Sequence, residues 1–179
     1  MTRSREEEEK QREVLDICWK PIKDDPTNFD AWTHLLQCIE QMDESKPARE
    51  AYDDFLKRYP YCYGYWRKYA DLERRHKHIE RASEVFERGV ASIPLSVDLW
   101  LSYVNFVKET AKESESKESK IRLLYERAVS ACGLEFRSDK LWEDYINWEL
   151  ELSHFANALA LYDRVLTVPT QLYSGHFEK

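Results

Sequence analysis

The sequence predicts an all-α protein, built as a right-handed α-solenoid of antiparallel helix pairs. Three observations support this fold class. Glycine and proline are scarce, with 4 and 6 residues in a chain of 179, whereas 42% of the residues are hydrophobic and 34% are charged. A tryptophan recurs at a constant period. The apolar residues after each tryptophan are spaced by three and four, which places them on one face of a helix.

The tryptophans set the length of the repeat. Trp32, Trp66 and Trp100 are 34 residues apart, and Trp142 follows after 42. A proline six residues before a repeat tryptophan and an aromatic residue twenty residues after one keep the same register. These markers are Pro26, Pro60 and Pro94, followed by Tyr52, Phe86 and Tyr162. Because one short helix pair cannot bury its apolar face alone, we expect neighbouring pairs to stack and share a core.

This register divides the chain into seven segments. They are a charged N-terminal extension (1–13), a lone helix of a preceding half repeat (14–25), four repeats (26–60, 61–94, 95–133 and 134–169) and the start of a truncated further repeat (170–179). In the lone helix, the spacing of Val14, Leu15, Cys18 and Trp19 predicts that these side chains face inward. The incomplete units at both ends lead us to expect a longer parent protein.

Each repeat is expected to begin with a capped helix. Asn28, Ser96 and Ser138 stand four residues before a repeat tryptophan, where a side-chain oxygen can accept a hydrogen bond from the free amides of the first turn. Cys62 occupies this position in the second repeat and breaks the pattern.

The third repeat is longer than the others. Tyr125 follows Trp100 by 25 residues, and the additional residues fall in the polar run 112–120, which has no apolar periodicity. This run predicts an exposed turn between the two helices of the repeat. Phosphorylation of its serines is the alternative role.

The periodic aromatic residues are predicted to form the core of the repeats. Their period and their common helical face favour packing over a recognition surface for peptides or RNA bases. The predicted repeat-core residues are Trp32, Trp66, Tyr69, Trp100, Tyr103, Trp142, Tyr145, Tyr52, Phe86, Tyr125 and Tyr162.

The motifs around these residues identify a family. The first helices read Trp66-Arg-Lys-Tyr69-Ala-Asp-Leu72-Glu73 and Trp142-Glu-Asp-Tyr145-Ile-Asn-Trp148-Glu149, and the second helices contain Phe86-Glu87-Arg88 and Tyr125-Glu126-Arg127. This pattern resembles the HAT (half-a-TPR) repeat family, which is found overwhelmingly in RNA-processing proteins. A tetratricopeptide repeat has the same period but prefers Gly or Ala a few residues after the tryptophan.

Longer strings extend the resemblance over residues 14–177. Tyr59-Pro-Tyr-Cys-Tyr-Gly-Tyr-Trp66 and Ile93-Pro-Leu-Ser-Val-Asp-Leu-Trp100 are similar to strings in a family of HAT-repeat splicing factors. The resemblance implies a nuclear scaffold that contacts U1 small nuclear ribonucleoprotein (U1 snRNP) proteins and assists 5′ splice-site selection. It also implies that the parent protein dimerises mainly through C-terminal repeats absent from this chain. A generic TPR-like adaptor that binds a peptide is the alternative.

Charged residues suggest two further features. Glu73 with Arg88 and Glu149 with Arg164 hold matching positions in the second and fourth repeats, which predicts structural ion pairs between the two helices of each repeat. A basic turn, formed by Arg74, Arg75, Lys77 and Arg81, is a candidate contact for RNA or an acidic partner. A solvated turn explains the same charges.

Several classes of function are disfavoured. The net charge of −7 argues against an extended nucleic-acid surface. Cys18, Cys38, Cys62 and Cys132 form no CxxC pair, so neither a metal site nor a disulfide framework is expected. No nucleophile with a matching base and no Gly-rich phosphate loop is recognisable, so we expect a protein that is not an enzyme and uses no cofactor. The first twelve residues are charged and no long apolar stretch follows, so no membrane segment is expected.

Overall fold

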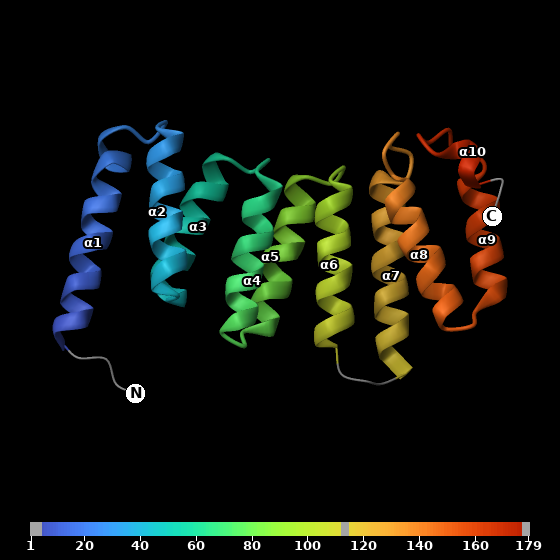
Figure 1. Ribbon diagram of the computed structural model, residues 1–179, viewed down its shortest axis with the longest axis horizontal. Coiled ribbons are helices and arrows are strands. Elements are labelled where there is room, and N and C mark those ends of the chain that lie inside the picture. Colours follow the sequence, from blue (N-terminus) through green and yellow to red (C-terminus); the bar gives the residue numbers. More distant parts are fainter. Residues whose placement is uncertain (1–4, 112–114, 177–179) are drawn as a thin grey trace. The chain divides into compact units, whose positions relative to one another are not determined.

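The computed structural model describes residues 5–111 and 115–176, and this part of the chain is helical without strands (Figure 1). The all-α prediction is confirmed. In chain order the helices are α1 (Arg5–Asp24), α2 (Phe29–Met42), α3 (Ser45–Arg58), α4 (Tyr63–Arg75), α5 (Ile79–Ser92), α6 (Val97–Thr110), α7 (Glu115–Cys132), α8 (Asp139–Glu151), α9 (Phe155–Val165) and α10 (Tyr173–His176). None of these described helices has the length and apolar character needed to cross a lipid bilayer.

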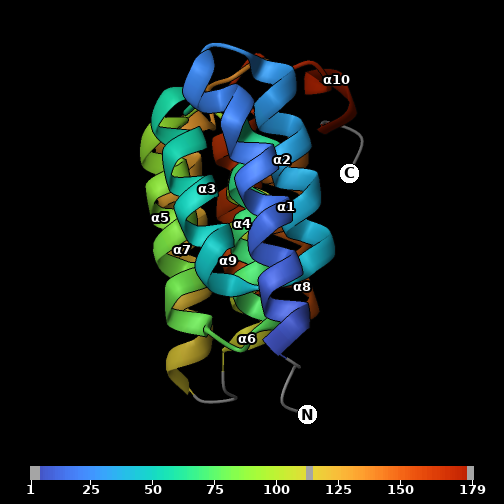
Figure 2. The ribbon, with the colours of Figure 1, turned by 90° about the vertical axis from the view of Figure 1, so that its left-hand side faces the viewer.

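The chain divides into two compact units, Met1–Val85 and Phe86–Lys179, with the division inside α5. In the first unit, α1 packs against α2, α2 against α3, and α3 against α4. Seen from the α1 end, α2 and α3 lie on either side of α1 (Figure 2). In the second unit, α6 packs against α7, α7 against α8, and α8 against α9. Successive helices in each unit run in opposite directions (Figure 1).

The indole nitrogens explain the constant spacing between proline and tryptophan. Trp32 Nε1 donates a hydrogen bond to the carbonyl oxygen of Pro26 at 3.0 Å. Trp66 and Trp100 bond to Pro60 and Pro94 in the same way, at 2.8 Å each. Each tryptophan thus fixes the loop before its own helix. Its ring is buried, and the carbonyl oxygen satisfies the indole N–H in place of water.

In the fourth repeat, the indole N–H also bonds to a carbonyl oxygen of the preceding loop, but the residue that supplies it is different. Trp142 Nε1 donates to the carbonyl oxygen of Gly133 at 2.9 Å, and the Ser138 hydroxyl donates to the same oxygen at 2.7 Å. The predicted capping role of Ser138 is therefore wrong, since its hydroxyl binds a loop carbonyl and caps no amide. Asn28 and Ser96 do cap, accepting hydrogen bonds from Ala31 N at 3.1 Å and Leu99 N at 3.3 Å.

The predicted core residues are buried with one exception. Tyr162 is only partly buried, whereas the other predicted repeat-core residues are at most 5% exposed. Truncating a buried aromatic residue such as Trp66 to alanine is expected to cost about 3–5 kcal/mol of folding free energy.

The N-terminal helix differs from its prediction. A single helix, α1, covers part of the predicted charged extension together with the predicted lone helix. Cys18 is buried, Leu15 and Trp19 are half-buried, and Val14 is 42% exposed rather than inward. Cys18 contacts Cys38, which lies one turn before α2 ends at Met42. Because the two helices run in opposite directions (Figure 1), Val14 lies one turn beyond Cys18 toward that end, where α2 covers little of α1.

The predicted exposed turn 112–120 is also corrected. Residues 112–114 lie outside the described part of the chain, but α7 already begins at Glu115. Glu and Lys are strong helix formers even without an apolar stripe, and the buried Ile121 follows directly. The polar run therefore contributes the first turns of a helix.

Candidate functional site

Neighbouring repeats are joined by stacked aromatic rings. In each case an aromatic residue of a second helix stacks on the tyrosine three residues after the next repeat tryptophan. The pairs are Tyr52–Tyr69 (5.0 Å between ring centroids, 6° between planes), Phe86–Tyr103 (5.1 Å, 8°) and Tyr125–Tyr145 (4.4 Å, 5°). These contacts explain why the two aromatic positions recur together in the sequence.

A buried carboxylate reinforces the contact between α3 and α4. Glu73 is 1% exposed, and Arg49 donates to both of its oxygens, at 2.6 and 2.8 Å. His78 Nδ1 lies 3.0 Å from Glu73 Oε2. Burial alone would raise the pKa of Glu73, but the hydrogen bonds and charges of Arg49 and His78 outweigh it, so this pKa lies below its ordinary value.

The second unit repeats this arrangement between α7 and α8. Arg122 donates to both oxygens of the buried Glu149, at 2.6 and 3.0 Å, and His154 Nδ1 lies 2.9 Å from Glu149 Oε2. Burial would raise the pKa of Glu149, and hydrogen bonds from Arg122 and Asn157 lower it below its ordinary value. The second cluster corrects the predicted ion pair Glu149–Arg164, because Arg164 binds Glu126 instead. The predicted pair Glu73–Arg88 stays a prediction. The arginine that holds each glutamate comes from the preceding repeat.

Arg164 has a different partner. It donates to both oxygens of Glu126, at 2.7 and 3.1 Å, and Arg127 donates in the same way to Glu87, at 2.8 and 2.7 Å. Glu87 and Glu126 are about two-fifths exposed, at 43% and 40% of their side-chain surface. These pairs lie at the surface, so their charges are better hydrated than those of Glu73 and Glu149.

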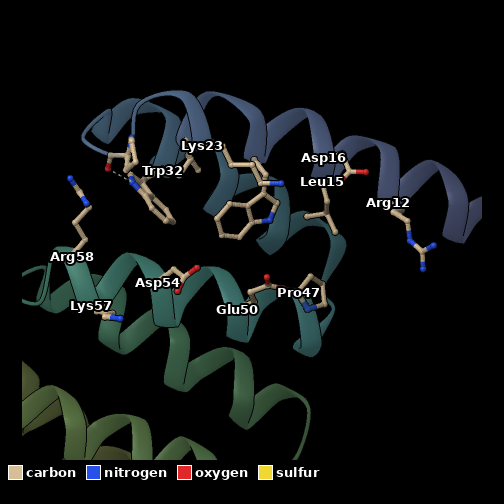
Figure 3. A pocket seen from close by; sticks show the side chains of 13 residues that line it. Arg12, Leu15, Asp16, Lys23, Trp32, Pro47, Glu50, Asp54, Lys57 and Arg58 are labelled. Carbon is tan, nitrogen blue, oxygen red and sulfur yellow. Dashed lines mark hydrogen bonds between the residues drawn. The ribbon is translucent and has the colours of Figure 1, made fainter.

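The first unit contains a groove between α1 and α3, with a volume of about 780 Å³ (Figure 3). Its apolar part is formed by the half-buried side chains of Leu15, Trp19 and Pro47, above the buried Ile22 and Trp32. The ring of Trp19 meets that of Trp32 edge to face, with 5.7 Å between centroids.

Charged side chains surround this apolar surface. In Figure 3, Glu50 and Asp54 line the α3 wall near the middle of the groove, Lys57 and Arg58 lie toward one end, and Arg12 lies toward the other. An apolar floor with charges of both signs at its rim is typical of a site that takes apolar side chains of a peptide and orients them by polar contacts.

The basic turn joins α4 to α5. Arg74 lies 3.5 Å from Asp71, and Arg75 lies 3.4 Å from Asp43, so both guanidinium groups have a carboxylate nearby. Lys77 and Arg81 are exposed. The four predicted residues therefore lie around one turn, but aspartates partly neutralise two of them, which weakens the attraction for phosphate.

Among the described residues, one cluster of side chains that could hold a metal ion was missed by the sequence reasoning. Cys18 of α1 and His34 and Cys38 of α2 place their potential ligand atoms within 4.8 Å of one another. The only available signal was the four-residue spacing of His34 and Cys38 on one helix, because Cys18 lies on another helix.

Comparison with known proteins agrees with this architecture. The chain superposes on the crystal structure of MamA with a TM-score of 0.51 and 12% sequence identity, covering 93% of this chain and 95% of that one, a likeness that shows the fold alone. Stacked helix pairs with these motifs define a HAT-repeat protein. The family described as the PRP39 N-terminal HAT repeat matches residues 16–179, and the chain belongs to this family.

Curated relatives carry the same family name. The chain is 54% identical over 161 residues to pre-mRNA-processing factor 39 of Danio rerio, covering 89% of this chain and 21% of that protein. It is 52% identical over 162 residues to pre-mRNA-processing factor 39 of Mus musculus, covering 90% of this chain and 24% of that protein. The chain thus spans less than a quarter of the length of the Danio rerio relative.

Proposed function

We propose that this chain is the protein-binding part of a nuclear pre-mRNA splicing factor, and that it binds protein segments of the U1 snRNP and so assists 5′ splice-site selection. Membership of the PRP39 family and the names of the curated relatives support a role in pre-mRNA processing. The helical-repeat fold supports a scaffold without catalytic activity.

The α1–α3 groove is the observation that carries this proposal. It offers a concave apolar surface in which Leu15 and Trp19 are half-buried and available to a partner. An apolar side chain of a U1 protein segment, held in an extended or helical conformation, fits such a surface, and the charged rim sets its direction.

Capture of partners from nuclear extract tests the proposal. The chain is immobilised and incubated with extract at moderate and high salt, with and without ribonuclease, and bound proteins and RNA are identified. The proposal expects U1 snRNP proteins that remain after ribonuclease and high salt, because apolar contacts resist both. Recovery that requires intact RNA and low salt would contradict it and favour RNA binding through the basic turn.

A further inference from the structure

Three side chains of α1 and α2 meet in an arrangement typical of a soft metal ion. Cys18 Sγ lies 3.3 Å from Cys38 Sγ, and Cys38 Sγ lies 4.0 Å from His34 Nδ1. His34 and Cys38 are one turn apart on α2, so they project from the same face toward α1, which packs beside it (Figure 1). All three ligand atoms lie within 4.8 Å of one another.

We propose that Cys18, His34 and Cys38 bind a zinc ion that joins α1 to α2. Zinc prefers tetrahedral coordination by thiolate sulfur at about 2.3 Å and imidazole nitrogen at about 2.0–2.1 Å. These lengths require neighbouring ligand atoms to be about 3.5–3.8 Å apart in a tetrahedron. The sulfur–sulfur distance of 3.3 Å and the sulfur–nitrogen distance of 4.0 Å each differ from this range by a few tenths of an ångström. The remaining separation, between Cys18 and His34, is at most 4.8 Å, so a rotation of the exposed His34 side chain is needed to complete the site.

Three protein ligands leave a fourth position. His34 is exposed and Cys38 is half-buried, so a water molecule or a partner side chain can reach the ion from solvent. Cys18 is 4% exposed and closes the opposite side. Two cysteines and one histidine with an open position match the ligand types and number that zinc accepts.

Zinc binding releases two protons. Burial raises the pKa of the Cys18 thiol to about 11, with a smaller contribution from its hydrogen bond to Cys38, so this thiol is protonated at neutral pH without a metal. On binding, each thiol passes its proton to the solvent and its sulfur takes the ion as a thiolate. The hydrogen bond between the two sulfurs is then replaced by a shared zinc ion.

The inference does not depend on the proposed function, because its test measures metal binding. The fully reduced chain, kept in a phosphine reductant that does not bind zinc, is titrated with Co²⁺ as a spectroscopic substitute for Zn²⁺. We expect one equivalent of cobalt to give the visible absorption of a tetrahedral cobalt–thiolate site, and zinc to displace it. Zinc should also raise the melting temperature, because it binds the folded chain.

Variants separate this site from adventitious binding. His34→Gln alters an exposed residue, so it leaves the fold intact and should abolish the cobalt spectrum and the zinc-dependent rise in melting temperature. Cys18→Ser and Cys38→Ser should do the same. Cys62→Ser is the matched control, because Cys62 stands alone before α4 in the first unit and its removal should leave both signals unchanged.

Three results would overturn the proposal. The first is the absence of a tetrahedral cobalt spectrum in a chain whose four thiols are all reduced. The second is the persistence of that spectrum in His34→Gln. The third is a disulfide-linked peptide containing Cys18 and Cys38 in the chain purified without reductant, combined with no metal uptake after reduction. That result would assign the two sulfurs to a redox pair.

Discussion

The first unit presents two candidate contact regions, the α1–α3 groove and the basic turn, and they differ in what their side chains already do. Groove residues Leu15 and Trp19 leave apolar surface half-exposed. At the basic turn, by contrast, Arg75 lies beside Asp43, and His78 contacts the buried Glu73. Some of the charged side chains around this turn form contacts that hold helices together. The apolar surface in the groove, by contrast, remains available to a partner.

A cluster of charges in the sequence is therefore weak evidence for a binding surface. Arg74 and Arg75 have carboxylates nearby, and the cluster beneath the turn joins α3 to α4 through Arg49 and Glu73. The groove is less visible in the sequence because its lining comes from three helices and a loop.

Among substitutions of charged residues, the largest effect on folding is expected from Arg49→Ala. The substitution leaves the Glu73 carboxylate, which is 1% exposed, without its bidentate donor. Breaking a buried ion pair by removing one partner costs about 3–5 kcal/mol, and urea unfolding measures this loss. Arg67→Ala, which removes the exposed Arg67–Asp71 pair, is the control and should cost less than about 1 kcal/mol. Equal losses in the two variants would show that Glu73 is effectively hydrated.

The pH dependence of stability should identify the same carboxylate. The pKa of Glu73 lies below its ordinary value of 4.5 in the folded chain, so the unfolded chain binds this proton more readily. Its contribution to stability is therefore present above pH 4.5 and is lost as the pH falls through the lower, folded pKa. We expect the stability difference between the wild type and Glu73→Gln to narrow below pH 4.5 in urea unfolding experiments. A difference that is constant down to pH 3 would refute this assignment.

A double-mutant cycle should show the correct register of the ion pairs in the second unit. Glu149 with Arg122 should give clear coupling, because Arg122 binds both oxygens of this buried carboxylate. Glu149 with Arg164 should give coupling near zero, because Arg164 binds Glu126. The reverse order would restore the pairing within one repeat.

The smallest effect is expected at the basic turn. Lys77→Gln with Arg81→Gln removes two exposed charges. Stability should change by no more than about 0.5 kcal/mol, as is usual for surface substitutions. Protein capture from nuclear extract should be unaffected. Loss of captured U1 proteins in this variant would move the binding site from the groove to the turn.

The sequence was informative about the helices because the helical spacing of apolar residues in each repeat involves residues that are close together in the chain. Trp66 and Tyr69 lie one turn apart, and their burial follows from helical periodicity. The position of α7 was missed because the run before Ile121 is polar, and helix propensity outweighed the absent apolar stripe.

Partners across repeats were harder to predict than helices. Arg49 and Glu73 are 24 residues apart, and Arg122 and Glu149 are 27 apart, so comparing positions within one repeat missed both arginines. A second helix packs against the first helix of the following repeat, and only this packing shows which charges meet. The groove and the cluster of Cys18, His34 and Cys38 also combine residues of different helices, so no local sequence motif predicts them.

The most direct test of the groove is a comparison of two substitutions on α1. Leu15→Asp places a charge on the groove surface, whereas Ile17→Asp places the same charge on a residue that is 70% exposed and does not line the groove. Both chains are used to capture proteins from ribonuclease-treated nuclear extract, after circular dichroism has shown equal helicity. The account predicts that Leu15→Asp loses the U1 snRNP proteins and that Ile17→Asp retains them. Equal retention by both variants would contradict it.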